Sequence, residues 1–158
     1  TTAAKLINTR NVSSFARGLM NAHGLSDWTF KLDNAKRRAG CCKYRSKTIQ
    51  LSRFYVDHNT DADIRDTVLH EVAHAIAGHA AGHGPLWKAV CRRIGAKPVR
   101  CYNSSIVNMP EAKYEATCWG CGKVFRRHKR VSRGRFIYCI ACGPDRGKLE
   151  FVCKRNQS

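Results

Sequence analysis

The 158-residue sequence predicts an α+β domain followed by a small cysteine-rich module. Segments with helical and with strand periodicity follow one another in the first part of the chain. Apolar residues make up 43% of the sequence, which is enough for a hydrophobic core. Four of the nine cysteines form two CxxC pairs near the C-terminus. We expect the domain to span residues 1–115 and the module to span residues 116–158.

The N-terminal part of the chain is predicted to form one helix and a small sheet. Ser13 and Ser14 can cap a helix whose apolar side chains recur at helical spacing, and Gly24 can end it. Three short segments then have the composition or the alternation of strands, and the last two of them are expected to pair as a hairpin. They are residues 28–33, 41–45 and 48–52.

Two further helices are predicted after this sheet. Asp61 or Asp63 begins a strongly periodic helix, and acidic residues in the first turn suit the helix dipole. Gly78 is expected to end that helix. Pro85 suits the first position of another helix that runs to about Ile94. The order helix, sheet, helix, helix indicates the α+β class.

The first of these two helices contains the motif His70-Glu71-Val72-Ala73-His74. Residues four apart lie one turn apart on the same helix face, so both imidazoles can bind one tetrahedral Zn²⁺. Glu71 would then lie beside the activated water as a general base. The alternative is a pair of solvated surface histidines, which would leave the further histidines nearby unexplained.

A third ligand has to come from beyond this helix, and two histidines follow it. If the helix continued, His79 would lie about 140° around the axis from His74, so it could bind only if the helix broke sharply at Gly78. His83 lies in a turn between two glycines, which allows the backbone to fold back. The residues favour His83, while the role of His79 stays open.

These motifs together resemble the SprT-like metallopeptidase family, which includes the eukaryotic Spartan proteases. The resemblance is carried by the HExxH motif, by Gly-His-Gly-Pro-Leu-Trp at residues 82–87 and by Arg-Ile-Gly at residues 93–95. It covers the chain from about residue 10 to about residue 150. The resemblance implies a minimal zincin-type metallopeptidase domain, with Glu71 as the catalytic base. The implied ligands of the catalytic zinc are His70, His74 and His83.

A peptidase site also needs a group that stabilises the developing oxyanion. The sequence offers five candidates and does not distinguish between them. They are Tyr44, Tyr55, Tyr102, His58 and His79.

The two CxxC pairs near the C-terminus, Cys118-Trp-Gly-Cys121 and Cys139-Ile-Ala-Cys142, are separated by 17 residues. This spacing is typical of a four-cysteine zinc ribbon, and an odd total of cysteines argues against a disulfide framework. Four thiolates leave no position for water, so this zinc is predicted to be structural. The sequence therefore predicts two zinc ions per chain, one catalytic and one structural.

A net charge of +18 favours a polyanionic partner. Between the CxxC pairs, six Lys or Arg residues stand in ten positions, flanked by aromatic residues, which predicts a basic hairpin arm that contacts nucleic acid. They are Arg126, Arg127, Lys129, Arg130, Arg133 and Arg135. No feature reads bases, so we expect DNA binding without sequence preference, single-stranded DNA included.

The sequence thus predicts a zinc-dependent endopeptidase that a basic zinc ribbon targets to DNA, and the family resemblance implies proteins bound or crosslinked to DNA as substrates. The alternative is a nucleic-acid-binding zinc protein whose first domain is structural or non-proteolytic. A zinc deaminase is disfavoured because its signature is absent. Without a signal peptide or a membrane-spanning segment, we expect an intracellular protein, in the cytoplasm and nucleoid or in a nucleus, and a monomer.

Overall fold

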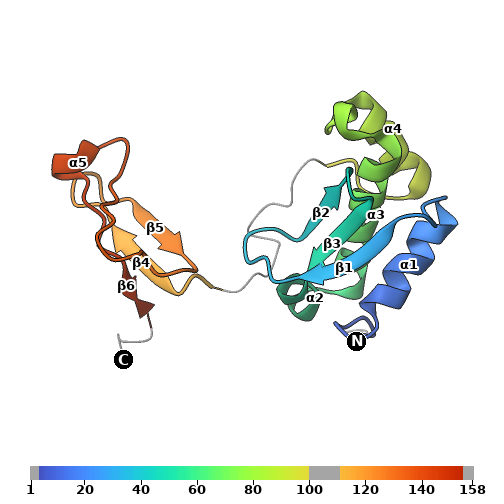
Figure 1. The fold of residues 1–158 in the computed structure, drawn as a ribbon, viewed down its shortest axis with the longest axis horizontal. Coiled ribbons are helices and arrows are strands. Elements are labelled where there is room, and N and C mark those ends of the chain that lie inside the picture. The colour runs from blue at the N-terminus through green and yellow to red at the C-terminus, as the bar shows by residue number, and fades with distance from the viewer. Residues whose placement is uncertain (1–3, 100–110, 155–158) are drawn as a thin grey trace. The chain divides into compact units, whose positions relative to one another are not determined.

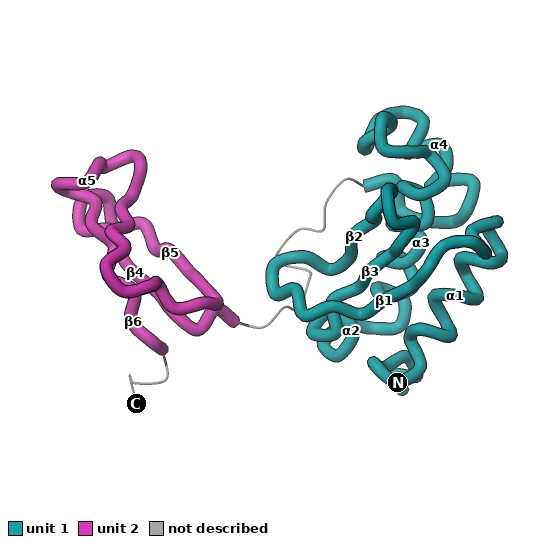
Figure 2. The backbone as a smooth tube through the Cα atoms, viewed as in Figure 1, with its two compact units in different colours: residues 1–109 teal, residues 110–158 magenta. Residues whose placement is uncertain are grey.

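The computed structural model describes residues 4–99 and 111–154. The chain divides into two compact units, residues 1–109 and residues 110–158 (Figure 2). The predicted boundary between residues 115 and 116 falls inside strand β4 (Tyr114–Thr117) of the second unit. Helices and small sheets occur together, so the predicted α+β class is confirmed. None of the helices in these two ranges is long and apolar enough to cross a bilayer.

The first unit combines a three-stranded sheet with helices (Figure 1). The sheet order is β1-β3-β2, with β1 parallel and β2 antiparallel to β3. The strands are β1 (Thr29–Asp33), β2 (Gly40–Lys43) and β3 (Thr48–Ser52). The helices are α1 (Val12–Ala22), α2 (Arg53–His58), α3 (Asp61–Ala77), the 3₁₀ turn η1 (His79–Ala81) and α4 (Pro85–Ile94).

Local capping explains where these helices begin. The Thr60 side chain accepts a hydrogen bond from the Asp63 amide at the start of α3, and acidic residues occupy its first turn as predicted. α1 begins at Val12, before the predicted serine cap, and its N-cap residue Asn11 makes no capping hydrogen bond with its side chain. α2 was not predicted from the sequence. It begins where the Ser52 hydroxyl accepts from the Tyr55 amide.

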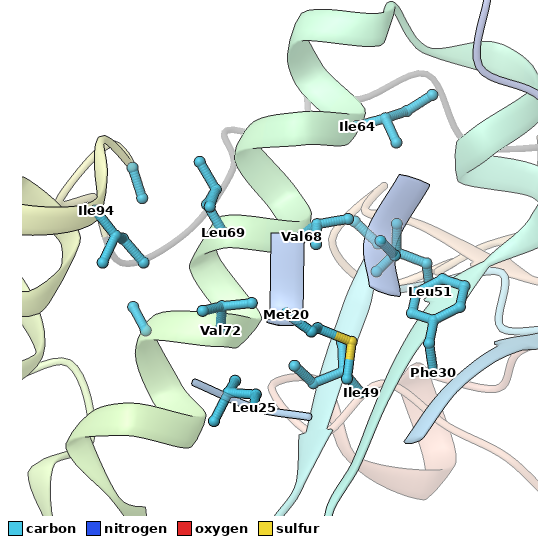
Figure 3. Close-up of a cluster of buried hydrophobic side chains, with 14 of the residues drawn as sticks. Met20, Leu25, Phe30, Ile49, Leu51, Ile64, Val68, Leu69, Val72 and Ile94 are labelled. Carbon is cyan, nitrogen blue, oxygen red and sulfur yellow. The ribbon is translucent and has the colours of Figure 1, made fainter. Parts of the chain in front are cut away.

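The core of the first unit lies between the sheet and the helices α1 and α3 (Figure 3). Phe30 and Leu32 of β1 pair with Ile49 and Leu51 of β3, so these side chains share one face of the sheet. Other buried members come from the helices and the segment after α1: Met20, Leu25, Ile64, Val68, Leu69, Val72 and Ile94. This packing fixes α3 against β2 and β3, and it therefore fixes the position of the motif that α3 carries.

The second unit is built around a small antiparallel sheet of order β5-β4-β6, with β5 (Val124–Arg127) and β6 (Val152–Cys153) on either side of β4. A short helix, α5 (Gly143–Arg146), follows the second CxxC pair. β5 pairs with β4, and residues 128–136 form no strand. The predicted basic hairpin arm is therefore wrong: its basic residues lie at the end of β5 and in an irregular segment.

Candidate metal centres

Three histidines of the first unit converge on one point. His70 and His74 come from α3, and His83 comes from the turn between η1 and α4. The Nε2 atom of His83 lies 3.0 Å from that of His74 and 3.3 Å from that of His70. Nitrogen ligands of a tetrahedral zinc are about 3.3–3.4 Å apart, given Zn–N bonds of about 2.0–2.1 Å. The three nitrogens therefore fit a single zinc ion.

Glycines shape the turn that brings His83 to this point. α3 ends at Gly78 with a φ of 87°, and Gly82, with a φ of 49°, reverses the chain after η1. Only glycine adopts such values without strain. The helix thus breaks where the alternative ligand His79 required it to break. Even so, within the described chain it is His83 that joins the cluster, while the exposed His79 packs edge-on against Tyr44 at 5.2 Å between ring centroids.

Burial keeps the imidazoles of His70 and His74 neutral. Loss of hydration, with a smaller effect of the neighbouring histidines, lowers the pKa of His70 to about 3 and that of His74 to about 4. A neutral imidazole offers a lone pair at neutral pH, which is the form that binds a metal.

Trp87 of α4 packs against all three histidines. Its ring centroid lies 4.8 Å from that of His70, 5.3 Å from that of His74 and 4.7 Å from that of His83. The side chain is fully buried. It connects the turn that carries His83 to the two ligand candidates on α3. Trp87 belongs to the Gly-His-Gly-Pro-Leu-Trp segment, but the sequence assigned it no role. Its apolar spacing with Val90, Cys91 and Ile94 on one helix face was the signal that it is buried.

We expect Trp87→Leu to weaken zinc binding at the histidine cluster by about 10- to 100-fold, the effect of removing a group that orients metal ligands. Trp87→Phe should retain most of the affinity, because the ring contacts persist and the buried Nε1 has no hydrogen-bond partner among the described residues. Competition with a chelator measures both. Val90→Ala, on the buried face of the same helix, is the control. If Val90→Ala weakens zinc binding equally, Trp87 affects the metal site only through the general stability of the fold.

Glu71 lies beside this cluster and is buried, with 7% of its surface exposed. Burial raises the pKa of its carboxyl to about 8, and the charge of Arg38 acts in the opposite direction. Gly40 on β2 leaves the space that the carboxylate occupies, because a Cβ atom at this position would lie 2.8 Å from Glu71 Oε1. Gly40 is thus a second residue of the site to which sequence analysis gave no role.

The surroundings of two of the five candidates for oxyanion stabilisation argue against this role. Tyr55 is fully buried and its hydroxyl bonds to Asp63 O and to Thr67, so it belongs to the core. His58 is exposed, with Nδ1 at 2.7 Å from the carbonyl of Phe54. Tyr102 lies outside the described residues.

Among the described candidates Tyr44 and His79 remain, and they contact each other. Burial raises the pKa of Tyr44 to about 12, assisted by negative charge on Cys42 and Glu71, so the phenol keeps its proton at neutral pH.

The second unit brings its four CxxC cysteines together: Cys118, Cys121, Cys139 and Cys142. Cys121 Sγ lies 3.8 Å from Cys139 Sγ, which matches the edge of about 3.8 Å of a tetrahedron with Zn–S bonds of about 2.3 Å. Gly120 permits this approach, because a Cβ there would lie 2.8 Å from Cys142 Sγ. Backbone hydrogen bonds from Cys121 and Gly120 lower the pKa of Cys118 and favour the thiolate.

The predicted DNA-contacting residues divide into two groups. Arg126 forms an ion pair with Glu115 at 2.9 Å, and Arg127 lies over the Phe151 ring at 5.6 Å. The other four are exposed residues of the segment after β5: Lys129, Arg130, Arg133 and Arg135. Exposed apolar side chains also occur in this unit, with Trp119 85% and Ile140 93% exposed, one in each CxxC pair.

Comparison with known proteins gives one family. A family model described as the SprT-like family matches residues 9–110. The chain is 32% identical over 113 residues to Protein SprT of Salmonella arizonae, which covers 66% of this chain and 68% of that protein. It is 31% identical over the same length, with the same coverage, to Protein SprT of Escherichia coli K12. No solved structure matches the chain.

Proposed function

The chain belongs to the SprT-like family, and from this membership we propose that it is a zinc-dependent endopeptidase that acts on DNA-associated proteins. The observation that carries the proposal is the convergence of three histidine Nε2 atoms, together with the buried Glu71 that directly follows His70 in α3. A zinc ion bound there would polarise the scissile carbonyl and make water a stronger nucleophile at neutral pH.

The residues of the chain have separate tasks in this reaction. The three histidines hold the metal. Glu71 accepts a proton from the attacking water and delivers it to the leaving amine. Gly40 keeps space for this carboxylate, because any side chain there would displace it. Tyr44 and His79 are the candidates for donating a hydrogen bond to the oxyanion.

The second unit supplies the DNA targeting in this proposal. Its four thiolates would hold a structural zinc, which brings the total to two ions per chain. Four exposed cations follow β5 and form no ion pair with a carboxylate among the described residues, and phosphate groups are their natural counter-charges. Tethering to DNA raises the local concentration of peptidase near DNA-bound proteins, including proteins crosslinked to DNA. The same proposal places the protein inside the cell as a monomer.

Cleavage of a histone with and without single-stranded DNA tests this function. We expect cleavage to be stimulated by DNA, and we expect the stimulation to fall in a variant with Lys129, Arg130, Arg133 and Arg135 replaced by Gln. If the protein cleaves without DNA and does not bind DNA at low salt, the proposed DNA targeting is wrong and the proposed peptidase activity stands. A protein that holds only one zinc, on its thiols, and cleaves nothing would favour the alternative of a nucleic-acid-binding zinc protein.

A further inference from the structure

The outer face of α4 carries a cluster of positive charge within the first unit. Trp87, Val90, Cys91 and Ile94 form the buried face of this helix. The opposite face carries Lys88, Arg92 and Arg93, and Lys97 lies three residues after the end of the helix. These four exposed cations are named here the α4 basic face. α4 contains no acidic residue. In the described part of the chain, none of these four side chains forms an ion pair with a carboxylate.

This arrangement is unfavourable for the isolated helix. Lys88 and Arg92 are four residues apart, so their charges lie one turn apart on the same side and repel each other. The four residues are close together on one helix and just after it, whereas the ion pairs of this unit, Arg38 with Asp33 and Lys47 with Asp27, lie on other elements. A polyanion with regularly spaced charges would remove the repulsion. Leu86 is the one large apolar side chain exposed on α4, which is too little for a membrane-binding helix.

We propose that the α4 basic face binds the phosphate backbone of nucleic acid. The inference rests on the proposed function, and it gives the peptidase unit a nucleic-acid contact of its own, separate from the second unit. Charge complementarity favours this occupant, since a chain with a net charge of +18 selects polyanions and a helix turn of about 5.4 Å places successive cations within reach of successive phosphates.

The position of the α4 basic face gives the contact a consequence for substrate choice. Lys88 directly follows Trp87, whose ring packs against the three histidines. The metal cluster and the bound phosphates would therefore lie on opposite sides of one helix, about 10 Å in diameter. A polypeptide attached to that nucleic acid would be held near the site of cleavage.

The test measures binding of the full-length, zinc-loaded protein to a fluorescein-labelled 20-nucleotide oligo-dT between 50 and 200 mM salt. The variant Lys88→Gln/Arg92→Gln/Arg93→Gln removes three positive charges from the α4 basic face. The control Arg10→Gln/Arg17→Gln/Lys31→Gln removes three exposed charges elsewhere on the same unit. Equal zinc content and equal circular dichroism establish that both variants are folded.

In the α4 variant, we expect the slope of log K against log salt to decrease in magnitude by about 2. Each phosphate contact with a single strand contributes about 0.7 to this slope, and the variant loses three contacts. The control should keep the slope of the original protein. Cleavage of a short peptide without DNA should be the same in all three proteins, because none of the substituted residues belongs to the metal site.

Three outcomes would overturn the inference: an unchanged slope in the α4 variant, an equal decrease in the control, or equally strong competition by polyglutamate, which would indicate an acidic protein partner. Failure of the proposed DNA targeting is distinguishable. In that case the original protein would not bind the oligonucleotide at all. If the inference alone fails, the original protein binds, and only the variant of the segment after β5 loses binding while the α4 variant matches its control.

Discussion

Glu71→Gln is expected to lower kcat/KM for peptide cleavage by about 10²- to 10⁴-fold, the usual contribution of a general base. Gln has almost the same volume and fits the space beside Gly40, but it cannot accept the proton of the attacking water. Glu71 is 7% exposed, so bulk buffer cannot easily replace it. The three histidines are unchanged, and zinc should therefore remain bound.

Peptidase assays combined with zinc analysis of the same samples separate a loss of proton transfer from a loss of zinc. Glu150→Gln is a matched control, because this carboxylate is exposed on the second unit and pairs only with Lys148 among the described residues. It should leave cleavage unchanged. Substantial turnover by a zinc-loaded Glu71→Gln protein would exclude Glu71 as the general base.

Cys139→Ser is expected to unfold the second unit while the first unit stays folded. The apolar core of the second unit is small and includes two of the proposed ligands: its buried members are Ala116, Cys118, Cys139 and Leu149. A core of this size cannot offset the chain entropy of a small unit without a further source of stability. Zinc bound by four thiolates supplies on the order of 10–16 kcal/mol in comparable small domains.

Limited proteolysis and zinc analysis test this prediction. The variant should hold one zinc ion, and residues 110–158 should become sensitive to protease while residues 1–109 stay resistant. Cys153→Ser is the matched control, because Cys153 lies in β6 outside the cluster and should be dispensable for zinc binding. A Cys139→Ser protein that keeps two zinc ions and a resistant second unit would show that the fold does not depend on this metal.

The α4 basic face and Trp87 show how one short helix can connect two parts of the proposed function. Its buried side orients the histidines, and its outer side carries unpaired charge. Sequence periodicity places α4 correctly, with Pro85 at its first position and Gly95 after its last. Periodicity does not predict what each face of α4 contacts, because these contacts depend on which elements pack together.

The sequence by itself determined the parts of this protein that depend on short spacing. An HExxH motif on a periodic helix places two imidazoles and a carboxyl one turn apart, and CxxC pairs place two thiols in one tight turn. The bounds of α3 and the hairpin of β2 and β3 follow from the same local rules, whereas the parallel pairing of β1 with β3 does not. The pairing of β5 with β4 and the existence of α2 do not, since short segments lack a decisive period.

Only the tertiary structure decided which distant residues complete the site. The sequence favoured His83 over His79, but the approach of His83 to the other two histidines depends on backbone reversals at Gly78 and Gly82 and on the packing of α4 against α3. The roles of Trp87 and Gly40 depend on contacts between elements far apart in the chain. The physical reason is that local spacing fixes directions within one helix or turn, whereas convergence on a metal requires several elements to be held together by a common core.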